Sequence, residues 1–174
     1  MNIPNWITLS RLLGIPILFI TLHTPTDSRR WLSLAIFLVV ASTDWLDGYL
    51  ARRLNQVTEL GKFLDPLVDK VLVLAPLLIL VDLHQVPAWG VFLILARELT
   101  IAGWRVNQTQ VSGANLWGKV KTVAQLGAIA LLISPLSDAW EQPTLIFFWV
   151  SVGLTLVSGL VYLWPRPHAS NASS

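Results

Sequence analysis

Six long apolar stretches limit what this chain can fold into more than any other feature of its sequence. They cover residues 5–22, 31–52, 62–82, 86–106, 117–136 and 143–164. Each is close to the ~20 residues that an α-helix needs to cross a bilayer. Hydrophobic residues make up 54% of the chain and charged residues 13%, against about 25% charged residues in soluble domains. The sequence therefore predicts an all-α, polytopic membrane protein with six transmembrane helices.

The chain of 174 residues leaves no room for a sizeable domain outside the membrane. We expect one membrane domain, residues 1–165, followed by a short, small and polar tail, residues 166–174, that is disordered. The apolar start lacks a preceding basic stretch and a small-residue cleavage site, so we expect it to stay as the first helix. Membrane lipid is the expected surrounding, and no nucleic-acid partner is expected.

Ionisable residues interrupt every apolar stretch of membrane length except the last, which is uncharged from Gln142 to Pro165. Such a residue within a span costs about 2.5 to 3.5 kcal/mol and usually faces a wet cavity or another charge. If consecutive helices alternate in direction, nearly all of these residues fall on one side of the membrane. The pattern predicts a polar cavity that opens on that side.

Lysine and arginine in the short connections predict the orientation, because cytoplasmic connections carry an excess of both. The side away from the cavity carries only Arg29 and Arg30. The cavity side carries Arg52, Arg53, Lys62, Arg105, Lys119, Lys121 and Arg166. We therefore expect a multi-pass protein of the cytoplasmic membrane, with its cavity and both termini facing the cytoplasm.

Four aspartates lie in the second and third apolar stretches. Asp44 and Asp47 are three residues apart, and Asp65 and Asp69 are four apart, so each pair lies on one face of a helix. The short connection makes the two helices antiparallel neighbours, which brings the four carboxylates to one level. Carboxylates packed in this way repel one another unless cations intervene. Because the chain has no cysteine, all-oxygen coordination of Mg²⁺ or Mn²⁺ is the natural solution.

The alternative for these aspartates is a set of structural ion pairs with nearby basic residues. That alternative is weaker for four carboxylates on facing helices, since apolar residues would be cheaper there. Gly48 and Ala51 leave backbone open for a ligand, or else serve close helix packing. Arg52 is suited to a bidentate phosphate contact, and Gly61 ends the turn before the third helix.

These residues together resemble the signature of the CDP-alcohol phosphatidyltransferase family. The matching pattern is Asp44-x2-Asp47-Gly48-x2-Ala51-Arg52-x8-Gly61-x3-Asp65-x3-Asp69. The resemblance implies a six-helix membrane enzyme that moves a phosphatidyl group from CDP-diacylglycerol to an alcohol and releases CMP. It implies two divalent ions held by the four aspartates, with Asp69 as the base on the acceptor hydroxyl, and a homodimer. It assigns CDP-diacylglycerol binding to Asp44, Gly48, Ala51, Arg52, Gly61 and Asp65.

The acceptor has to be inferred from the fourth and fifth stretches, whose charged residues fall on the cavity side. Glu98 and Arg105 are seven residues apart on nearly the same helix face and could pair, which would leave Arg97 beside Lys119 and Lys121. Several cations near a metal site favour an acceptor that carries its own phosphate. The alternative is that the cations only anchor helix ends at the membrane interface.

Three further segments resemble the bacterial phosphatidylglycerophosphate synthase branch of the family. They are NIPNWITLSR at the start, AREL with the following Trp104-Arg105, and GKVKTVAQ from Gly118. Trp104 departs from the leucine that this branch has there. The resemblance implies sn-glycerol 3-phosphate as acceptor, with its phosphate held by Arg97, Arg105, Lys119 and Lys121. It also implies that Asn5, Thr8 and Arg11 shape the headgroup site, although Asn5 and Thr8 are equally suited to helix capping.

Other functions remain open from the sequence. Within the family, the acceptor could be inositol phosphate, or phosphatidylglycerol in cardiolipin synthesis. A divalent-cation transporter would also place carboxylates in membrane helices, but no carboxylates continue the path through the far half of the spans. A scaffold role would leave the tryptophans to pack against partners rather than to anchor helices at the interface.

Overall fold

The computed structural model describes residues 3–54, 59–106 and 116–163, and most of these residues are helical. Within these ranges, residues 3–10, 44–54, 59–66, 105–106 and 163 are described by their backbone alone. Six α-helices and one short 3₁₀ turn make up the described part, which contains no strand. They are α1 (Ile3–His23), α2 (Asp27–Leu54), α3 (Glu59–Asp82), α4 (Ala88–Val106), α5 (Leu116–Ile133), η1 (Asp138–Trp140) and α6 (Glu141–Leu163). The predicted all-α class is confirmed, with one helix on each apolar stretch.

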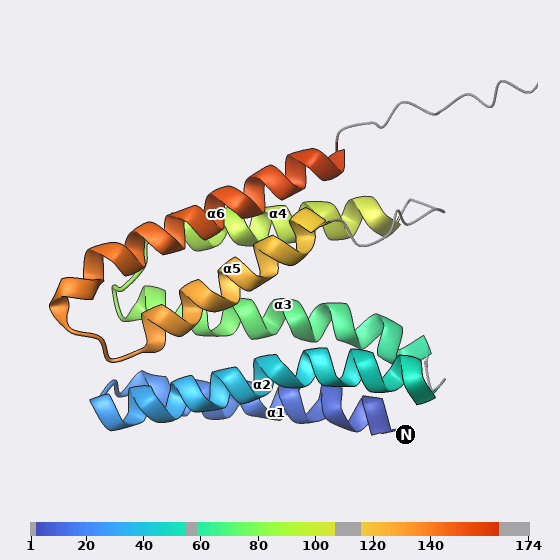
Figure 1. The fold of residues 1–174 in the computed structure, drawn as a ribbon, viewed down its shortest axis with the longest axis horizontal. Coiled ribbons are helices and arrows are strands. Elements are labelled where there is room, and N and C mark those ends of the chain that lie inside the picture. The colour runs from blue at the N-terminus through green and yellow to red at the C-terminus, as the bar shows by residue number, and fades with distance from the viewer. Residues whose placement is uncertain (1–2, 55–58, 107–115, 164–174) are drawn as a thin grey trace, which may run out of the picture.

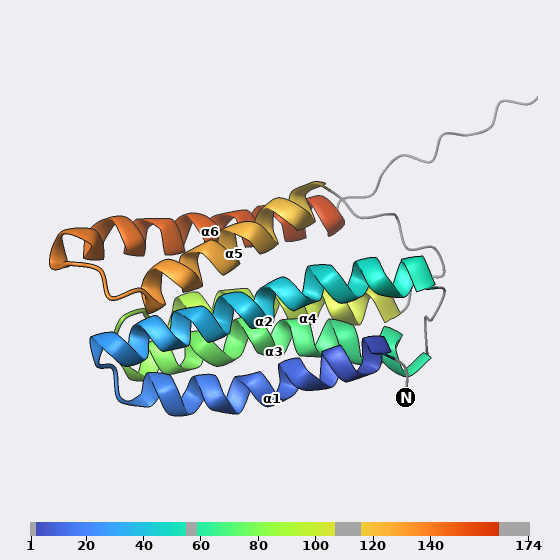
Figure 2. The same cartoon turned by 60° about the horizontal axis from the view of Figure 1, so that its bottom comes forward.

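Successive helices run in opposite directions along one bundle (Figures 1 and 2). The beginnings of α1, α3 and α5 and the ends of α2, α4 and α6 gather at one end, called here the terminal end. The connections at residues 24–26, 83–87 and 134–137 gather at the other, called the distal end. Helix α1 packs against α2 and α3, α6 packs against α4 and α5, and α5 also contacts α2 and α3. This alternation is the arrangement that the clustering of charges requires.

Small residues allow two of these helix pairs to approach closely. A Cβ added at Gly14 of α1 would lie 2.8 Å from Cγ2 of Val40 on α2. A Cβ added at Gly90 of α4 would lie 2.8 Å from the Phe148 ring on α6 and 3.0 Å from the Trp149 ring. Glycine at such contacts is typical of helix packing in membranes, where association depends on close van der Waals contact.

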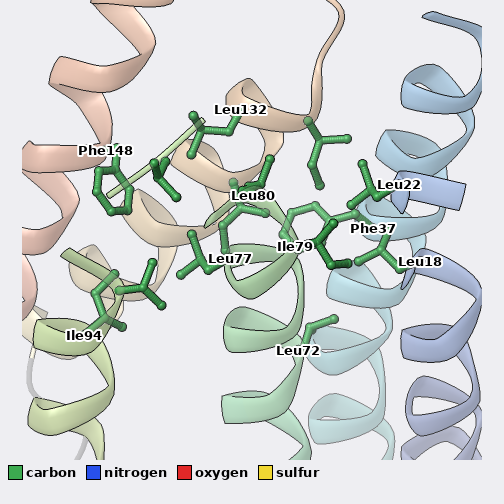
Figure 3. Packing of buried hydrophobic residues seen from close by; sticks show 14 of the residues in the cluster. Leu18, Leu22, Phe37, Leu72, Leu77, Ile79, Leu80, Ile94, Leu132 and Phe148 are labelled. Carbon is green, nitrogen blue, oxygen red and sulfur yellow. The ribbon is translucent and has the colours of Figure 1, made fainter. Parts of the chain in front are cut away.

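A buried apolar cluster fills the distal half of the bundle (Figure 3). Its helical members come from the second halves of α1, α3 and α5 and from the first halves of α2, α4 and α6. They include Leu18, Leu22, Phe37, Leu72, Leu77, Leu80, Ile94, Leu132 and Phe148. The four aspartates of the signature lie in the other half, toward the terminal end.

The distal end is also fixed by Arg30 near the start of α2. Its guanidinium donates hydrogen bonds to the carbonyl oxygens of Leu132, Ile133 and Ser134, at 2.7, 3.0 and 3.2 Å. These carbonyls lie at the end of α5, where a helix has unpaired acceptors and a partial negative charge. Arg30 thus caps α5 from a different helix and ties the two elements together.

The bundle has an apolar exterior and several polar residues inside it. Leu13, Ile20 and Leu160 are 64%, 71% and 67% exposed, respectively. The buried polar and charged side chains are Arg11, Ser33, Lys121, Gln125, Thr144, Ser151, Thr155 and Ser158. Among the described residues, two helices are long and apolar enough to cross a membrane, Leu116–Ile133 and Asp138–Tyr162, and Arg11–His23 is a shorter apolar helix.

Candidate active site

The four aspartates of the signature lie on two helices whose ends meet at the terminal end of the bundle. Asp44 and Asp47 belong to the second half of α2, and Asp65 and Asp69 to the first half of α3. The backbone is continuously helical through both pairs, as the argument from their three- and four-residue spacing requires. The side chains of Asp44, Asp47 and Asp65 lie outside the described residues. So do those of Gly48, Ala51, Arg52 and Gly61.

Asp69 is the signature aspartate whose side chain is described, and it is bound to Arg11 of α1. Nη1 of Arg11 donates a hydrogen bond to Oδ1 of Asp69 at 3.0 Å. The Arg11 side chain is 1% exposed, whereas that of Asp69 is 47% exposed. The buried guanidinium therefore holds a carboxylate that a ligand can still reach. The family resemblance implied that Arg11 shapes the headgroup site but named no partner for it. Arg11 and Asp69 are 58 residues apart, so no local pattern in the sequence connects them.

A second ionic cluster joins α4 to α5. Oε1 of Glu98 accepts a hydrogen bond from Nη1 of Arg97 at 3.1 Å and a second one from Nζ of Lys121. The side chains of Arg97 and Lys121 are each 10% exposed, and that of Glu98 is 15% exposed. One carboxylate thus faces two nearly buried cations, which leaves the cluster with a net positive charge. Such a site suits an anionic ligand.

Glu98 has two partners that the sequence did not predict. It was expected to be able to pair with Arg105, which stays a prediction, and it binds Arg97 and Lys121. Because a carboxylate in an apolar interior is costly unless it is paired and hydrogen-bonded, Glu98 is expected to bind buried cations within reach. The side chain of Arg105 lies outside the described residues.

The two lysines of α5 have different environments. Lys121 lies in the ionic cluster, and the residue as a whole is 8% exposed. Lys119 is exposed. Residues two apart on an α-helix point about 200° apart, which accounts for the difference. The structure brings Lys121 and Arg97 together and leaves Lys119 on the other side of α5.

Helix α6 supplies a polar contact to Arg97 that sequence analysis missed. Nη2 of Arg97 donates a hydrogen bond to Oγ of Ser158 at 2.5 Å. Three residues earlier on α6, Oγ1 of Thr155 accepts a hydrogen bond from Nε2 of Gln125 on α5 at 2.8 Å. The signal in the sequence is the spacing of Ser151, Thr155 and Ser158 at four and three residues on a helix that carries no charged residue after Glu141.

The predicted metal centre lies mostly outside the described side chains. Among the described side chains no three His, Cys, Asp or Glu residues lie close enough to hold a metal ion. Three of the four predicted ligands fall outside those side chains. Asp69, which is described, offers a half-exposed carboxylate at the terminal end, and oxygen donors of this kind fit Mg²⁺ or Mn²⁺.

Comparison with known proteins places the chain in a family. Residues 1–157 match the CDP-alcohol phosphatidyltransferase family. A Bacillus subtilis protein named CDP-diacylglycerol–glycerol-3-phosphate 3-phosphatidyltransferase is 43% identical, over 98% of this chain and 99% of its own length. Proteins of the same name from Escherichia coli and Haemophilus influenzae are 39% and 35% identical. The first match covers 93% of both chains, and the second covers 93% of this chain and 91% of the relative. The chain therefore belongs to the CDP-alcohol phosphatidyltransferase family.

Proposed function

We propose that this protein transfers the phosphatidyl group of CDP-diacylglycerol to sn-glycerol 3-phosphate, giving phosphatidylglycerophosphate and CMP in phosphatidylglycerol biosynthesis. The observation that carries the proposal is the nearly full-length match to relatives named for this pair of substrates. The buried cations of the ionic cluster support a phosphate-bearing acceptor, because a neutral alcohol would not need them.

The donor would bind at the terminal end of α2 and α3. Its proposed contacts are Asp44, Gly48, Ala51, Arg52, Gly61 and Asp65. The four aspartates would hold two divalent ions, Mg²⁺ or Mn²⁺, which neutralise the diphosphate charge and stabilise the leaving CMP. Asp69 would accept the proton of the attacking hydroxyl. Its observed contact with Arg11 suits that role, since it fixes one carboxylate oxygen.

The acceptor phosphate would bind at the cations of α4 and α5, which are Arg97, Arg105, Lys119 and Lys121. Among these, Arg97 and Lys121 have the observed support, because they are nearly buried and converge on Glu98. Positioning of the two substrates and electrostatic stabilisation carry most of the catalysis in phosphoryl transfer. Arg97 and Lys121, which Glu98 holds in place, serve both the positioning of the acceptor and the stabilisation of charge.

We also propose that residues 1–165 form one domain that crosses the cytoplasmic membrane six times, with the active site facing the cytoplasm and a tail at residues 166–174. Two helices with the length and composition of membrane spans support this, as do the exposed apolar exterior and the buried polar interior. A homodimer is part of the proposal on the family resemblance alone.

The test is product analysis of the purified protein with CDP-diacylglycerol, Mg²⁺ and one acceptor at a time. We expect CMP release and a new phospholipid with sn-glycerol 3-phosphate. Inositol phosphate and phosphatidylglycerol, offered separately, should give neither. A product formed only with one of those acceptors would replace the proposed substrate, and metal flux in vesicles without CMP release would contradict an enzyme altogether.

A substitution tests the role of Asp69. Asp69→Asn keeps the size of the side chain and its contact distance to Arg11, but removes the negative charge needed to accept a proton. We expect a folded protein that still binds CDP-diacylglycerol and turns over at least about 100-fold more slowly. The measurement is CMP release under saturating substrates together with a lipid-binding assay, and undiminished turnover would remove Asp69 from the role of base.

A further inference from the structure

Several residues contact the side chain of Arg97, and two of these, Ser158 and Gly159, belong to α6. Glu98 binds Nη1 at 3.1 Å from within α4, and Ser158 binds Nη2 at 2.5 Å from α6. The side-chain stem lies against Gly159, where an added Cβ would be 3.0 Å from Cγ and 3.2 Å from Nε of Arg97. Both distances are shorter than an ordinary van der Waals contact. A side chain at residue 159 would therefore displace the stem and Nε of Arg97 from their present positions.

One N–H donor of the same guanidinium has no acceptor among the described residues. Nε of Arg97 is buried and has no hydrogen-bond partner among the described residues. A buried N–H without an acceptor is costly, and its retention points to an acceptor supplied by a ligand. The Nε and Nη2 donors form one edge of the guanidinium, and such an edge binds phosphate through two parallel hydrogen bonds.

We propose that Ser158 and Gly159 are positioning residues that set the affinity for the acceptor phosphate through Arg97. Ser158 orients the Nε–Nη2 edge by binding Nη2, and Gly159 leaves the space in which the stem and Nε lie. The final helix, which carries no recognised motif of the family signature, thereby shapes the acceptor site. This inference rests on the proposed function, in which Arg97 binds the phosphate of sn-glycerol 3-phosphate.

The glycines of α6 provide a matched comparison. A Cβ at Gly153 would meet nothing within 4 Å, whereas a Cβ at Gly159 would press on Arg97. Both substitutions replace glycine by alanine in the same helix, so their effects on helix propensity are alike. Any difference between them reports the contact with Arg97.

The experiment measures kcat and the KM of each substrate for the purified full-length enzyme, with the melting temperature of each variant. The variants are Gly159→Ala, Ser158→Ala, Ser158→Thr, Arg97→Gln and the control Gly153→Ala. We expect Gly159→Ala and Ser158→Ala to raise the KM for sn-glycerol 3-phosphate about ten-fold, the loss typical of one misplaced contact to a charged group. The KM for CDP-diacylglycerol should change less than about two-fold, because the donor binds α2 and α3.

Two controls separate positioning from a general loss of structure. Ser158→Thr keeps the hydroxyl and should restore most of the affinity lost in Ser158→Ala. Gly153→Ala should match the unmodified enzyme in both KM values. Equal rises in both KM values with a lower melting temperature would mean that Ser158 and Gly159 serve the fold alone, and would overturn the inference.

Arg97→Gln separates failure of the inference from failure of the proposed function. If Arg97→Gln raises the KM for sn-glycerol 3-phosphate and Gly159→Ala and Ser158→Ala do not, the positioning role is wrong and the function stands. If Arg97→Gln has no effect on that KM, the inference is also wrong, since its target does not bind the acceptor. If the unmodified enzyme makes no product from sn-glycerol 3-phosphate, the proposed function itself fails.

Discussion

The ion pair of Arg11 with Asp69 joins a nearly inaccessible cation to a half-exposed carboxylate. A buried guanidinium is stable only with a hydrogen-bonded partner, and Asp69 supplies one to Arg11. Asp69, in contrast, keeps a face open to substrate. At the scale of the residue, the fold fixes the orientation of the proposed base without closing access to it.

Arg11→Lys tests this orientation. Lysine keeps the positive charge but lacks the rigid, planar donor geometry of arginine, and partners that orient catalytic-site ligands typically contribute about 10- to 100-fold to activity. We expect kcat to fall by that range, while the KM values of both substrates change little. Arg29→Lys, at an exposed distal position, is the control and should leave kcat unchanged. Equal kcat values for the two variants would contradict an orienting role for Arg11.

Glu98→Gln tests the ionic cluster. Without the carboxylate, Arg97 and Lys121 would lie close together, nearly buried and without a counter-charge, a change that typically costs about 3 to 5 kcal/mol. We expect a lower melting temperature that sn-glycerol 3-phosphate raises more than it does in the unmodified protein, because an anion replaces the missing charge. Thermal unfolding with and without the ligand measures both effects, and an unchanged melting temperature would show that Glu98 does not hold the cations.

At the scale of the element, the proposed acceptor site depends on the contact between α4 and α6. Gly90 meets Phe148 and Trp149 near the distal end, and Arg97 meets Ser158 further along the same two helices. The glycine contact sets the separation of the helices, and the arginine bridges them at that separation. A change at Gly90 therefore tests the packing apart from the chemistry.

Gly90→Ala should destabilise the bundle. Its Cβ would lie 2.8 Å from the buried Phe148 ring, and overpacking of this kind costs about 1 to 3 kcal/mol, more than the ~1 kcal/mol that alanine contributes to helix formation. Gly103→Ala on the same helix is the control, since a Cβ there meets nothing within 4 Å. Thermal unfolding in detergent compares them, and the prediction fails if Gly90→Ala is as stable as Gly103→Ala.

The apolar stretches predicted the existence and order of the helices because each helix must bury or expose a continuous apolar surface. Their ends were less predictable. The second stretch begins at residue 31, yet α2 begins at Asp27, because an acidic residue favours the first turn of a helix. The fourth stretch begins at residue 86, yet α4 begins at Ala88, directly after Pro87, since apolarity can continue where helical geometry does not.

The site was predictable where it depends on spacing within one helix and unpredictable where it depends on how helices are rotated against one another. The aspartate pairs follow from three- and four-residue spacing. The partner of Glu98 and the contact of Arg11 with Asp69 depend on the rotation of different helices, which no local pattern encodes. The predicted metal centre and donor pocket stay predictions, since most of their side chains lie outside the described residues.

At the scale of the whole molecule, the bundle is divided into two halves with different compositions. The apolar cluster fills the distal half, and the ion pairs of Asp69 and Glu98 lie toward the terminal end. The distal half can therefore supply packing stability while the terminal half carries polar groups that a lipid interior would penalise. Basic residues in the helix ends at the terminal end, such as Arg52, Arg53 and Lys62, predict that this half faces the cytoplasm.

Single cysteines test the orientation directly, because the sequence contains none. Ser137→Cys lies at the distal end, and Leu116→Cys lies at the start of α5, near the terminal end; both positions are exposed. In right-side-out vesicles, a membrane-impermeant maleimide should label Ser137→Cys, and it should label Leu116→Cys only after the membrane is opened. The reverse labelling pattern would invert the proposed topology, and labelling of both from one side would rule out a crossing between them.

The contact of Arg97 with Ser158 also bears on when the protein becomes active during its synthesis. Chains emerge from the ribosome beginning at the N-terminus, so α2 and α3, with the signature aspartates, are made long before α6. The hydroxyl that binds Nη2 of Arg97 belongs to residue 158 of 174. A nascent chain that already holds the complete donor signature still lacks this support for Arg97, and the proposed acceptor site is complete only when the last helix enters the bundle.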